Sequence, residues 1–179
     1  MIIMIIRKVK EDDADGIAYV SAYSWFETYQ GLVSEKYLNE KINNIDKKAV
    51  HEKEYIRNNP NGLVAIDNNS VIGFCYYGKD SNNIGEIGAL YLLKKYQGQG
   101  IGKELFFETI KKLVDFGCNE MLIECMCGND TVKFYKKYGG NIINTKDYVL
   151  HNREKVKVDV LKFEDITRIL ELDNIKRKK

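Results

Sequence analysis

The sequence predicts a domain of the α+β class, and two observations support this. The first is composition: 44% of the 179 residues are hydrophobic and 30% are charged, which suits a globular chain that buries a core better than a disordered one. The second is the expected order of elements, namely a strand, helices, three strands, a helix, a strand, a helix and two strands. This order lacks the regular alternation of strands and helices that builds a doubly wound parallel sheet.

The N-terminal third is expected to hold one strand followed by helices. Residues 2–9 are largely apolar and predict the strand. Residues 11–29 predict a helix, because the acidic cluster at their start suits the positive end of a helix dipole. A break is expected at Gly31. Residues 34–58 then predict a second helical region in two pieces, which ends before the Asn, Pro and Gly cluster of residues 58–62.

The middle third is expected to hold a hairpin, a further strand and a helix. The segments LVAID and VIGFCYY, joined by NNS, predict a short hairpin, and residues 83–93 predict a third strand. Residues 100–116 predict a helix, because apolar side chains recur at a spacing near 3.6. Gly117 is expected to end that helix.

The C-terminal third is expected to alternate between strands and a short helix. EMLIECMC predicts a strand, NDTVKFYKKY predicts a short helix closed by Gly139 and Gly140, and NIINT and VKVDVLKF predict closing strands. We expect residues 1–163 to form one domain and residues 164–179 to form a C-terminal helix or a frayed basic tail.

Charge and cysteine content exclude several classes of partner. The formal net charge is only +2, so no overall field calls for nucleic acid or an anionic membrane, and the basic tip 176–179 is expected to be a solvated end. The opening MIIMII is too short for a membrane span and lacks the flanks of a signal peptide. The four cysteines include no CxxC pair and there are two histidines, so we expect reduced thiols, no metal site and a cytoplasmic protein.

A glycine-rich stretch, YQGQGIG, lies directly before the predicted helix of residues 100–116. A helix N-terminus carries unpaired N–H groups and a partial positive charge, and glycines let the backbone approach a phosphate closely. A Walker A loop is excluded, because Glu104 stands where that loop needs Ser or Thr after Lys103. The GxGxG spacing and the central position in the chain also argue against a dinucleotide-binding fingerprint.

The same stretch resembles the acetyl-coenzyme A signature of the GNAT N-acetyltransferase superfamily, Gln/Arg-x-x-Gly-x-Gly/Ala, with Gln97, Gly100 and Gly102 at its fixed positions. NDTVKFYKKYGG resembles the family's second element, an asparagine that starts a short helix with a Phe-Tyr pair. The N-terminal helices are also similar to the acceptor-side helices of many bacterial members, through Ser24, Trp25, Tyr29, Gly31, Leu32 and Leu38. The resemblance covers residues 5–162. It implies a mixed, mostly antiparallel central sheet flanked by helices, with splayed central strands.

The resemblance implies an N-acetyltransferase that moves an acetyl group from acetyl-CoA to a primary amine by direct attack through a tetrahedral intermediate. The alternative is a non-catalytic acyl-CoA-binding sensor or assembly module. The pantetheine arm is expected along the strand at Leu90, Tyr91 and Leu92, with Asn129 and Tyr135 as further cofactor contacts. The pyrophosphate is expected on the main chain of the glycine stretch, at Gln97, Gly98, Gln99, Gly100, Ile101, Gly102 and Lys103.

The resemblance also implies catalytic roles. Tyr135 is expected to be the general acid, since a phenol with a pKa of about 10 stays protonated at neutral pH and can protonate a departing thiolate. Tyr135 could instead be one of many core aromatics. Glu86 is the expected base, directly or through water, with Glu124 as a rival and a solvated carboxylate as the alternative.

The acceptor side is less determined by the sequence. Trp25, Tyr29 and Tyr77 are candidates to line an acceptor pocket, and each could equally be a packing residue. The acceptor is expected to be a small-molecule amine or a peptide N-terminus, and the protein a monomer or homodimer.

Overall fold

The computed structural model describes residues 4–177, with side chains described for residues 4–171. The chain divides into two compact units. The first unit comprises residues 1–76 and 89–106, and the second comprises residues 77–88 and 107–179.

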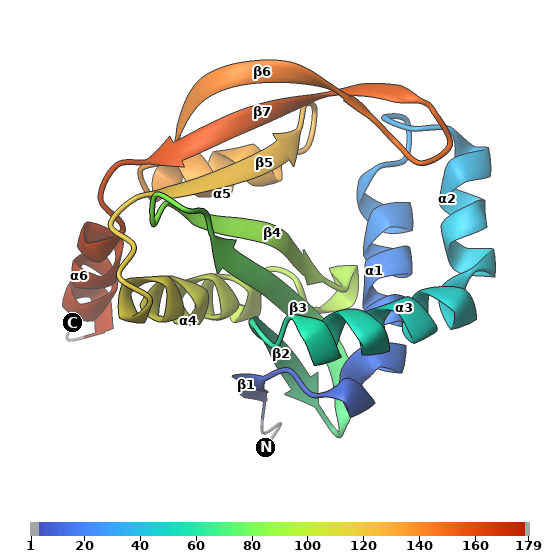
Figure 1. The fold of residues 1–179 in the computed structure, drawn as a ribbon, viewed down its shortest axis with the longest axis horizontal. Coiled ribbons are helices and arrows are strands. Elements are labelled where there is room, and N and C mark those ends of the chain that lie inside the picture. The colour runs from blue at the N-terminus through green and yellow to red at the C-terminus, as the bar shows by residue number, and fades with distance from the viewer. Residues whose placement is uncertain (1–3, 178–179) are drawn as a thin grey trace. The chain divides into compact units, whose positions relative to one another are not determined.

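The observed elements follow the order that the sequence predicts, which confirms the α+β class (Figure 1). Their bounds are β1 (Ile5–Lys8), the 3-10 helix η1 (Glu11–Asp13), α1 (Ala14–Thr28), α2 (Glu35–Asn43), α3 (Ile45–Asn58), β2 (Gly62–Asp67), β3 (Ser70–Lys79), β4 (Gly85–Leu92), the 3-10 helix η2 (Lys94–Tyr96), α4 (Ile101–Asp115), β5 (Met121–Met126), α5 (Thr131–Lys137), β6 (Asn141–Val149), β7 (Lys155–Phe163) and α6 (Ile166–Arg177).

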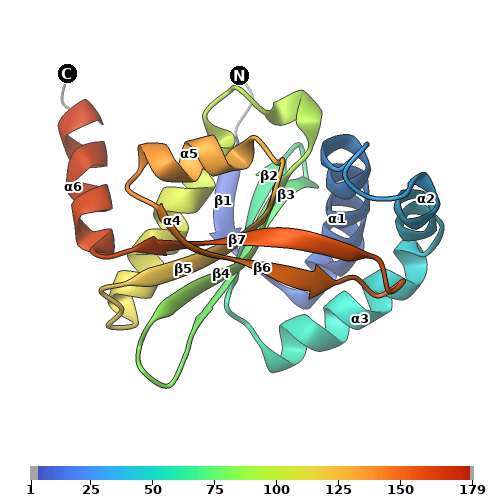
Figure 2. The same ribbon diagram turned by 90° about the horizontal axis from the view of Figure 1, so that it is seen from above.

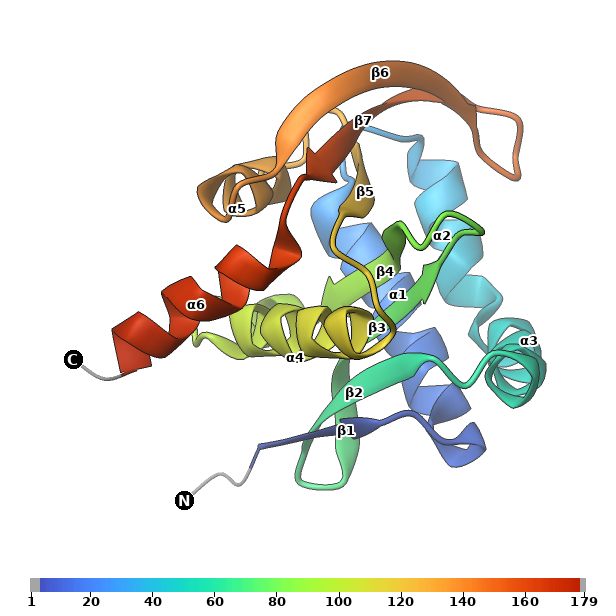
Figure 3. The same cartoon turned by 60° about the vertical axis from the view of Figure 1, so that its left-hand side comes forward.

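The strands pair in the hydrogen-bonding order β1-β2-β3-β4-β5-β7-β6. β1 and β2 pair antiparallel, as do β2 and β3, β5 and β7, and β6 and β7, while β4 and β5 pair in parallel. The sheet is therefore mixed and mostly antiparallel. Figure 3 shows the β1–β2 pair of the first unit, and Figure 1 shows the long curved hairpin of β6 and β7 in the second.

The parallel pairing of β4 with β5 is short. Its register runs from Gly85 opposite Met121 to Ile87 opposite Ile123. Within the described part of the chain the pairing ends there, although β4 continues to Leu92 and β5 to Met126.

The first unit packs apolar side chains against both faces of β2 and β3. Val64, Ile66, Phe74 and Tyr76 join a cluster with helix residues such as Ile17, whereas Ala65 and Ile72 join a second cluster with Leu92 and Ile101. Every residue of β2 is buried, which explains why LVAID is a continuous apolar run rather than an alternating one.

The helices of the first unit pack on one another and on the strands. α1 contacts both α2 and α3, and Figure 2 shows α1 and α2 side by side. A Cβ at Gly16 would lie 2.7 Å from Val71 Cγ2, so this glycine permits the close approach of α1 to β3. The predicted second helical region is split at Asn44, as expected.

The second unit is built around β5 and β7. Its most buried side chains include Leu113 of α4, Met121 of β5, Leu161 and Phe163 of β7, and Ile166 of α6. The ring of Phe107 meets that of Tyr138 edge-on at 5.2 Å. The last element of this unit is the helix α6, over Ile166–Arg177.

Element bounds differ from the sequence prediction at several ends. β6 runs on to Val149 instead of ending at residue 145, because every residue of this strand is exposed and no apolar alternation marks its second half. β4 begins at Gly85 rather than residue 83, because Asn83 has a positive φ of 60° in the preceding turn. Residues 2 and 3 of the predicted first strand and residues 178 and 179 of the basic tip lie outside the described residues.

Candidate functional site

The glycine stretch forms an exposed loop between η2 and α4. Gly98 and Gly100 have φ values of 75° and 84°, in the left-handed region that disfavours side chains. A Cβ at either position would meet no atom within 4 Å. These two glycines are therefore required by the backbone conformation rather than by packing, and they leave main chain accessible where a ligand can approach it.

Gly102 differs from the other two glycines of the stretch. It lies in the first turn of α4, its φ is not positive, and a Cβ there would contact Leu92 Cδ2 at an ordinary 3.7 Å. Its backbone conformation would accept a side chain.

The start of α4 provides unpaired backbone donors. The first hydrogen bond of the helix runs from Glu104 N to Gly100 O at 3.0 Å, so the N–H groups of Ile101 and Gly102 belong to the turn that has no intrahelical acceptor. The buried side chain of Ile101 packs with Ile72 and Leu92, which fixes the position of this helix end in the first unit. This arrangement favours an anion at the loop.

Side-chain hydrogen bonds hold the segment that leads into the loop. Glu27 Oε2 of α1 accepts from Lys94 N at 3.1 Å, and Asp67 Oδ2 at the end of β2 accepts from Tyr96 Oη at 3.1 Å. Gln97 donates from Nε2 to the carbonyl oxygen of Leu92 at 3.0 Å. Gln97 is expected to contact the cofactor through its main chain, and its side chain ties the loop to β4.

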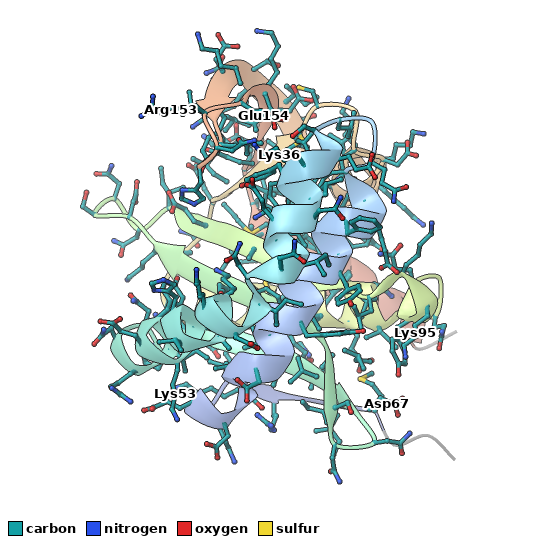
Figure 4. The ribbon with its side chains drawn as sticks, turned by 90° about the vertical axis from the view of Figure 1, so that its right-hand side faces the viewer. Lys36, Lys53, Asp67, Lys95, Arg153 and Glu154 are labelled. Atoms are coloured by element: carbon teal, nitrogen blue, oxygen red, sulfur yellow. The ribbon has the colours of Figure 1, made fainter. Side chains whose placement is uncertain are left out.

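Gln99 and Lys103 complete the stretch that the sequence singles out. Gln99 donates from Nε2 to the carbonyl oxygen of Lys95 at 3.0 Å, so its side chain also closes the loop on itself. Lys103 lies in the first turn of α4 with a half-buried side chain. Lys95, labelled in Figure 4 together with Asp67, places its Nζ 5.0 Å from the ring centroid of Tyr96.

Leu90, Tyr91 and Leu92 lie on the last part of β4. Leu93 donates its backbone N–H to Ile72 O at 3.0 Å, so this part of the strand is held on its β3 side. On the opposite side no strand among the described residues pairs with it, because the register with β5 ends at Ile87. An exposed strand edge of this kind can accept an extended ligand as an added strand.

Trp25 lies on the last turn of α1, and Tyr29 directly follows the end of the helix. Their ring centroids are 4.5 Å apart, and Trp25 Nε1 donates to Tyr91 Oη on β4 at 2.9 Å. The hydrogen bond ties Trp25 to the same strand segment as Leu90 and Leu92.

Sequence reasoning missed two residues that complete this aromatic group. Tyr37 and Lys41 of α2 stand one helical turn apart, and the Tyr37 ring meets the Trp25 ring edge-on at 5.9 Å. Lys41 Nζ lies 4.1 Å from the Trp25 ring centroid and 4.9 Å from that of Tyr37. Burial lowers the pKa of Lys41 to about 8, and the charge of Lys48 adds to this effect. The i, i+4 spacing of Tyr37 and Lys41 was the available signal, but nothing in the sequence pointed to Trp25 as their common partner.

Asn129 and Tyr135 lie in the second unit. Asn129 Oδ1 accepts from Thr131 N at 2.9 Å, so this side chain bonds to the first residue of α5 from outside the helix, whose N-cap is Asp130. Tyr135 is buried on α5 with its ring centroid 5.5 Å from that of Phe134, and its carbonyl oxygen accepts from Gly140 N at 3.0 Å. α5 begins at Thr131, two residues after the predicted start at Asn129, and Gly139, with a φ of 97°, follows its end as predicted.

The two candidate bases have different surroundings. Glu86 is exposed at the start of β4, opposite Leu122, and its carboxylate makes no hydrogen bond or ion pair with any residue in the described range. Glu124 on β5 is paired with Lys146 Nζ at 2.5 Å. Of the two carboxylates, only Glu86 has no partner among the described side chains.

Tyr77 belongs to the second unit, whereas Trp25 and Tyr29 belong to the first. Its side chain is buried, and its ring centroid lies 5.9 Å from that of Phe116. No three His, Cys, Asp or Glu side chains within the described residues gather as a metal site, and none of the helices described is long and apolar enough to cross a membrane.

Comparison with known proteins gives consistent results. Residues 18–140 match the acetyltransferase (GNAT) family. The chain is 30% identical over 138 residues to the uncharacterized N-acetyltransferase YuaI of Bacillus subtilis, and the aligned region covers 74% of this chain and 78% of YuaI. It is 29% identical over 155 residues to the spermidine N(1)-acetyltransferase of Thermoplasma acidophilum, covering 83% of this chain and 96% of the relative.

The fold is similar to that of solved acetyltransferases. The PaiA N-acetyltransferase of Thermoplasma acidophilum, in complex with coenzyme A, superposes with a TM-score of 0.71 at 24% identity, over 90% of this chain and 98% of the other. YncA of Salmonella typhimurium, a structure that holds acetyl-CoA, gives a TM-score of 0.65 at 16% identity, over 90% and 93% of the two chains.

Proposed function

Because this chain belongs to the acetyltransferase (GNAT) family and is an acetyl-CoA-dependent enzyme, we propose that it acetylates the primary amine of a small molecule or of a peptide N-terminus. The observation that carries the proposal is the glycine loop. Gly98 and Gly100 adopt positive φ with open space beside them, and the loop leads into the N-terminal turn of α4.

The loop fits the pyrophosphate of acetyl-CoA. Main-chain N–H groups from Gly98 to Lys103 supply the donors, since the side chains of Gln97 and Gln99 are used within the loop. The last part of β4, at Leu90–Leu92, is proposed to receive the pantetheine arm as an added strand. Asn129 is proposed as a further contact to the cofactor. This assignment rests on the family motif, since the Asn129 side chain bonds to the first residue of α5.

The proposed reaction is direct acyl transfer. The neutral amine attacks the thioester carbonyl and forms a tetrahedral intermediate, whose oxyanion accepts a hydrogen bond from a backbone N–H of the Leu90–Leu92 segment. The intermediate then expels the thiolate of coenzyme A. Tyr135 donates its phenolic proton to this thiolate, which yields the free thiol and the N-acetyl product.

Glu86 is the proposed base that removes the proton from the acceptor ammonium, directly or through a water molecule. The contrast with Glu124 supports this choice, because the Glu124 carboxylate is already held in an ion pair with Lys146. A Glu86→Gln variant should lose the acidic limb of the pH dependence of kcat/KM. An unaltered pH profile would reassign the base.

Small amines are the first acceptors to test. The relative from Thermoplasma acidophilum is named as a spermidine N(1)-acetyltransferase, which supports a small amine over a peptide N-terminus. We place the enzyme in the cytoplasm, as its four cysteines are free thiols, and its oligomeric state is proposed as monomer or homodimer.

Release of free thiol from acetyl-CoA tests the proposal. Purified protein is incubated with acetyl-CoA and, one at a time, with alkylamines, amino acids, polyamines, aminoglycosides and short peptides, and the thiol is measured. We expect acceptor-dependent release with at least one class. Tight binding of acetyl-CoA without thiol release from any class would instead indicate the non-catalytic sensor or assembly module.

A further inference from the structure

Lys41 has unusual surroundings for a lysine. Its ammonium group rests on the faces of Trp25 and Tyr37, at 4.1 Å and 4.9 Å from the ring centroids. Within the part of the chain whose side chains are described, no carboxylate pairs with it. The neighbouring Lys48, by contrast, pairs with Glu52 Oε1 at 2.6 Å.

An ammonium group in this position has lost hydration without gaining a counter-ion. Lysines are seldom buried unless they are paired, because removing the charge from water is costly. The aromatic faces offset part of that cost through their quadrupoles. The lowered pKa of Lys41 has the same origin, since burial is its largest cause. An anion brought to Lys41 would therefore gain more than an anion brought to a fully hydrated lysine.

The surroundings of Lys41 are fixed by contacts within the first unit. Trp25 is held by its hydrogen bond to Tyr91 Oη on β4 and by the ring of Tyr29. Trp25 and Tyr29 are two of the three residues that the sequence offers as lining of an acceptor pocket, and β4 is the strand proposed to hold the pantetheine arm. Lys41 contacts one of these candidates directly, since its ammonium group lies over the Trp25 ring.

We propose that Lys41 binds a carboxylate of the acceptor, so that the natural acceptor is a small amine that also carries a carboxylate, such as an amino acid. This inference rests on the proposed acetyltransferase function and on the acceptor side being formed by Trp25 and Tyr29. A diamine or polyamine is disfavoured, because its second ammonium would approach the unpaired charge of Lys41.

A matched set of acceptors tests the inference. At each of several chain lengths, an alkylamine, an α,ω-diamine and an ω-amino acid present the same reacting amine and differ only at the other end. For the wild-type enzyme we expect kcat/KM to be highest for the amino acid and lowest for the diamine. A preference for the diamine would overturn the proposal.

Substitutions at Lys41 test whether this residue is responsible. Lys41→Met should lower kcat/KM for the amino acid by about 10- to 100-fold, as expected for loss of a hydrogen bond to a charged group, and should leave the alkylamine nearly unaffected. Lys41→Arg should restore most of the preference. Lys36→Met, an exposed position on the same helix that is labelled in Figure 4, is the matched control and should change none of the three substrates.

Failure of this inference can be told apart from failure of the proposed function. Thiol release with amines but without a preference for the amino acid, or a preference that Lys41→Met retains, refutes the role of Lys41 alone. Absence of thiol release with every acceptor refutes the enzymatic function. Calorimetric titration with the same three ligands gives a readout that needs no turnover, and equal binding of the amino acid by wild type and Lys41→Met would also refute the role of Lys41.

Discussion

Replacing Gly100 by alanine should weaken the binding of coenzyme A, and the magnitude follows from the backbone. Gly100 has a φ of 84° and a Cβ there would touch nothing within 4 Å, so the substitution causes no steric clash. What it adds is the cost of placing an L-residue in the left-handed region, about 1–2 kcal/mol. Since about 1.4 kcal/mol changes an equilibrium constant tenfold, this corresponds to a dissociation constant raised by about 5- to 30-fold.

The cost should appear in affinity rather than in stability. The side-chain hydrogen bonds that tie this segment to α1, β2 and β4 involve Lys94, Tyr96 and Gln97, which all precede the two positive-φ glycines. The side chain of Gln99 bonds within the loop, to the carbonyl oxygen of Lys95. The exposed turn at Gly100 can therefore relax in the free protein, and binding of the pyrophosphate must restore the strained conformation. Coenzyme A affinity by calorimetry and thermal unfolding, both measured on Gly100→Ala, separate the two contributions.

Gly117→Ala is the matched control. Gly117 has a φ of 82°, is exposed, has no atom within 4 Å of a built Cβ, and follows the last turn of α4 rather than its first. It should lower the melting temperature by a few degrees and leave coenzyme A affinity unchanged. The reasoning is refuted if Gly100→Ala changes neither affinity nor stability, or if Gly117→Ala weakens coenzyme A binding to the same extent.

Three further predictions concern single side chains. Tyr135→Phe should lower kcat by about 100-fold or more with little change in the KM for acetyl-CoA, and undiminished kcat in steady-state assays would remove Tyr135 from the mechanism. Tyr96→Phe should lower the free energy of unfolding by about 1–3 kcal/mol in urea titrations, because Asp67 Oδ2 would lose its donor while Asp67 Oδ1 is already buried with no partner among the described residues. The double variant Tyr96→Phe with Asp67→Asn should lose less stability than Tyr96→Phe alone. An equal or larger loss in the double variant would contradict the prediction. Burial lowers the pKa of Lys41 from 10.5 to about 8, so between pH 8 and pH 10.5 the unfolded chain binds more protons than the folded one. The free energy of unfolding of the wild type, measured relative to that of Lys41→Met, should therefore increase as the pH rises from 8 to 10.5.

Most elements of the fold could be predicted because their signals are local. NNS between two apolar runs predicted a hairpin, and the structure places Asn68 and Asn69 at φ values of 47° and 65°, the left-handed conformation that asparagine tolerates in tight turns. β6 was predicted too short because its second half carries no local signal of this kind. It forms the outer strand of the sheet beside β7 and is exposed on all its residues, so its second half carries no alternation of apolar and polar side chains.

The candidate site, too, could be predicted only where the sequence carries a local signal. The glycine loop could be found from the sequence, because spacing alone identifies a backbone site that uses no side chains. Only the structure shows that Gly98 and Gly100 have positive φ values whereas Gly102 does not. Contacts such as that between Tyr96 and Asp67, which are 29 residues apart, depend on the packing of β2 against the loop and leave no local pattern.

Lys41 shows why the acceptor is harder to infer than the cofactor. A cofactor held by main chain requires particular backbone conformations, and glycine spacing records them in the sequence. An acceptor is recognised by side chains from different elements, here Trp25 of α1 and Lys41 of α2, and either residue alone could serve in packing. Their significance comes from the combination of a desolvated ammonium, two aromatic faces and no carboxylate partner among the described side chains. If Lys41 only covered Trp25, methionine would do so equally well and without the cost of desolvating a charge, so keeping a lysine there is better explained by a ligand that needs the charge.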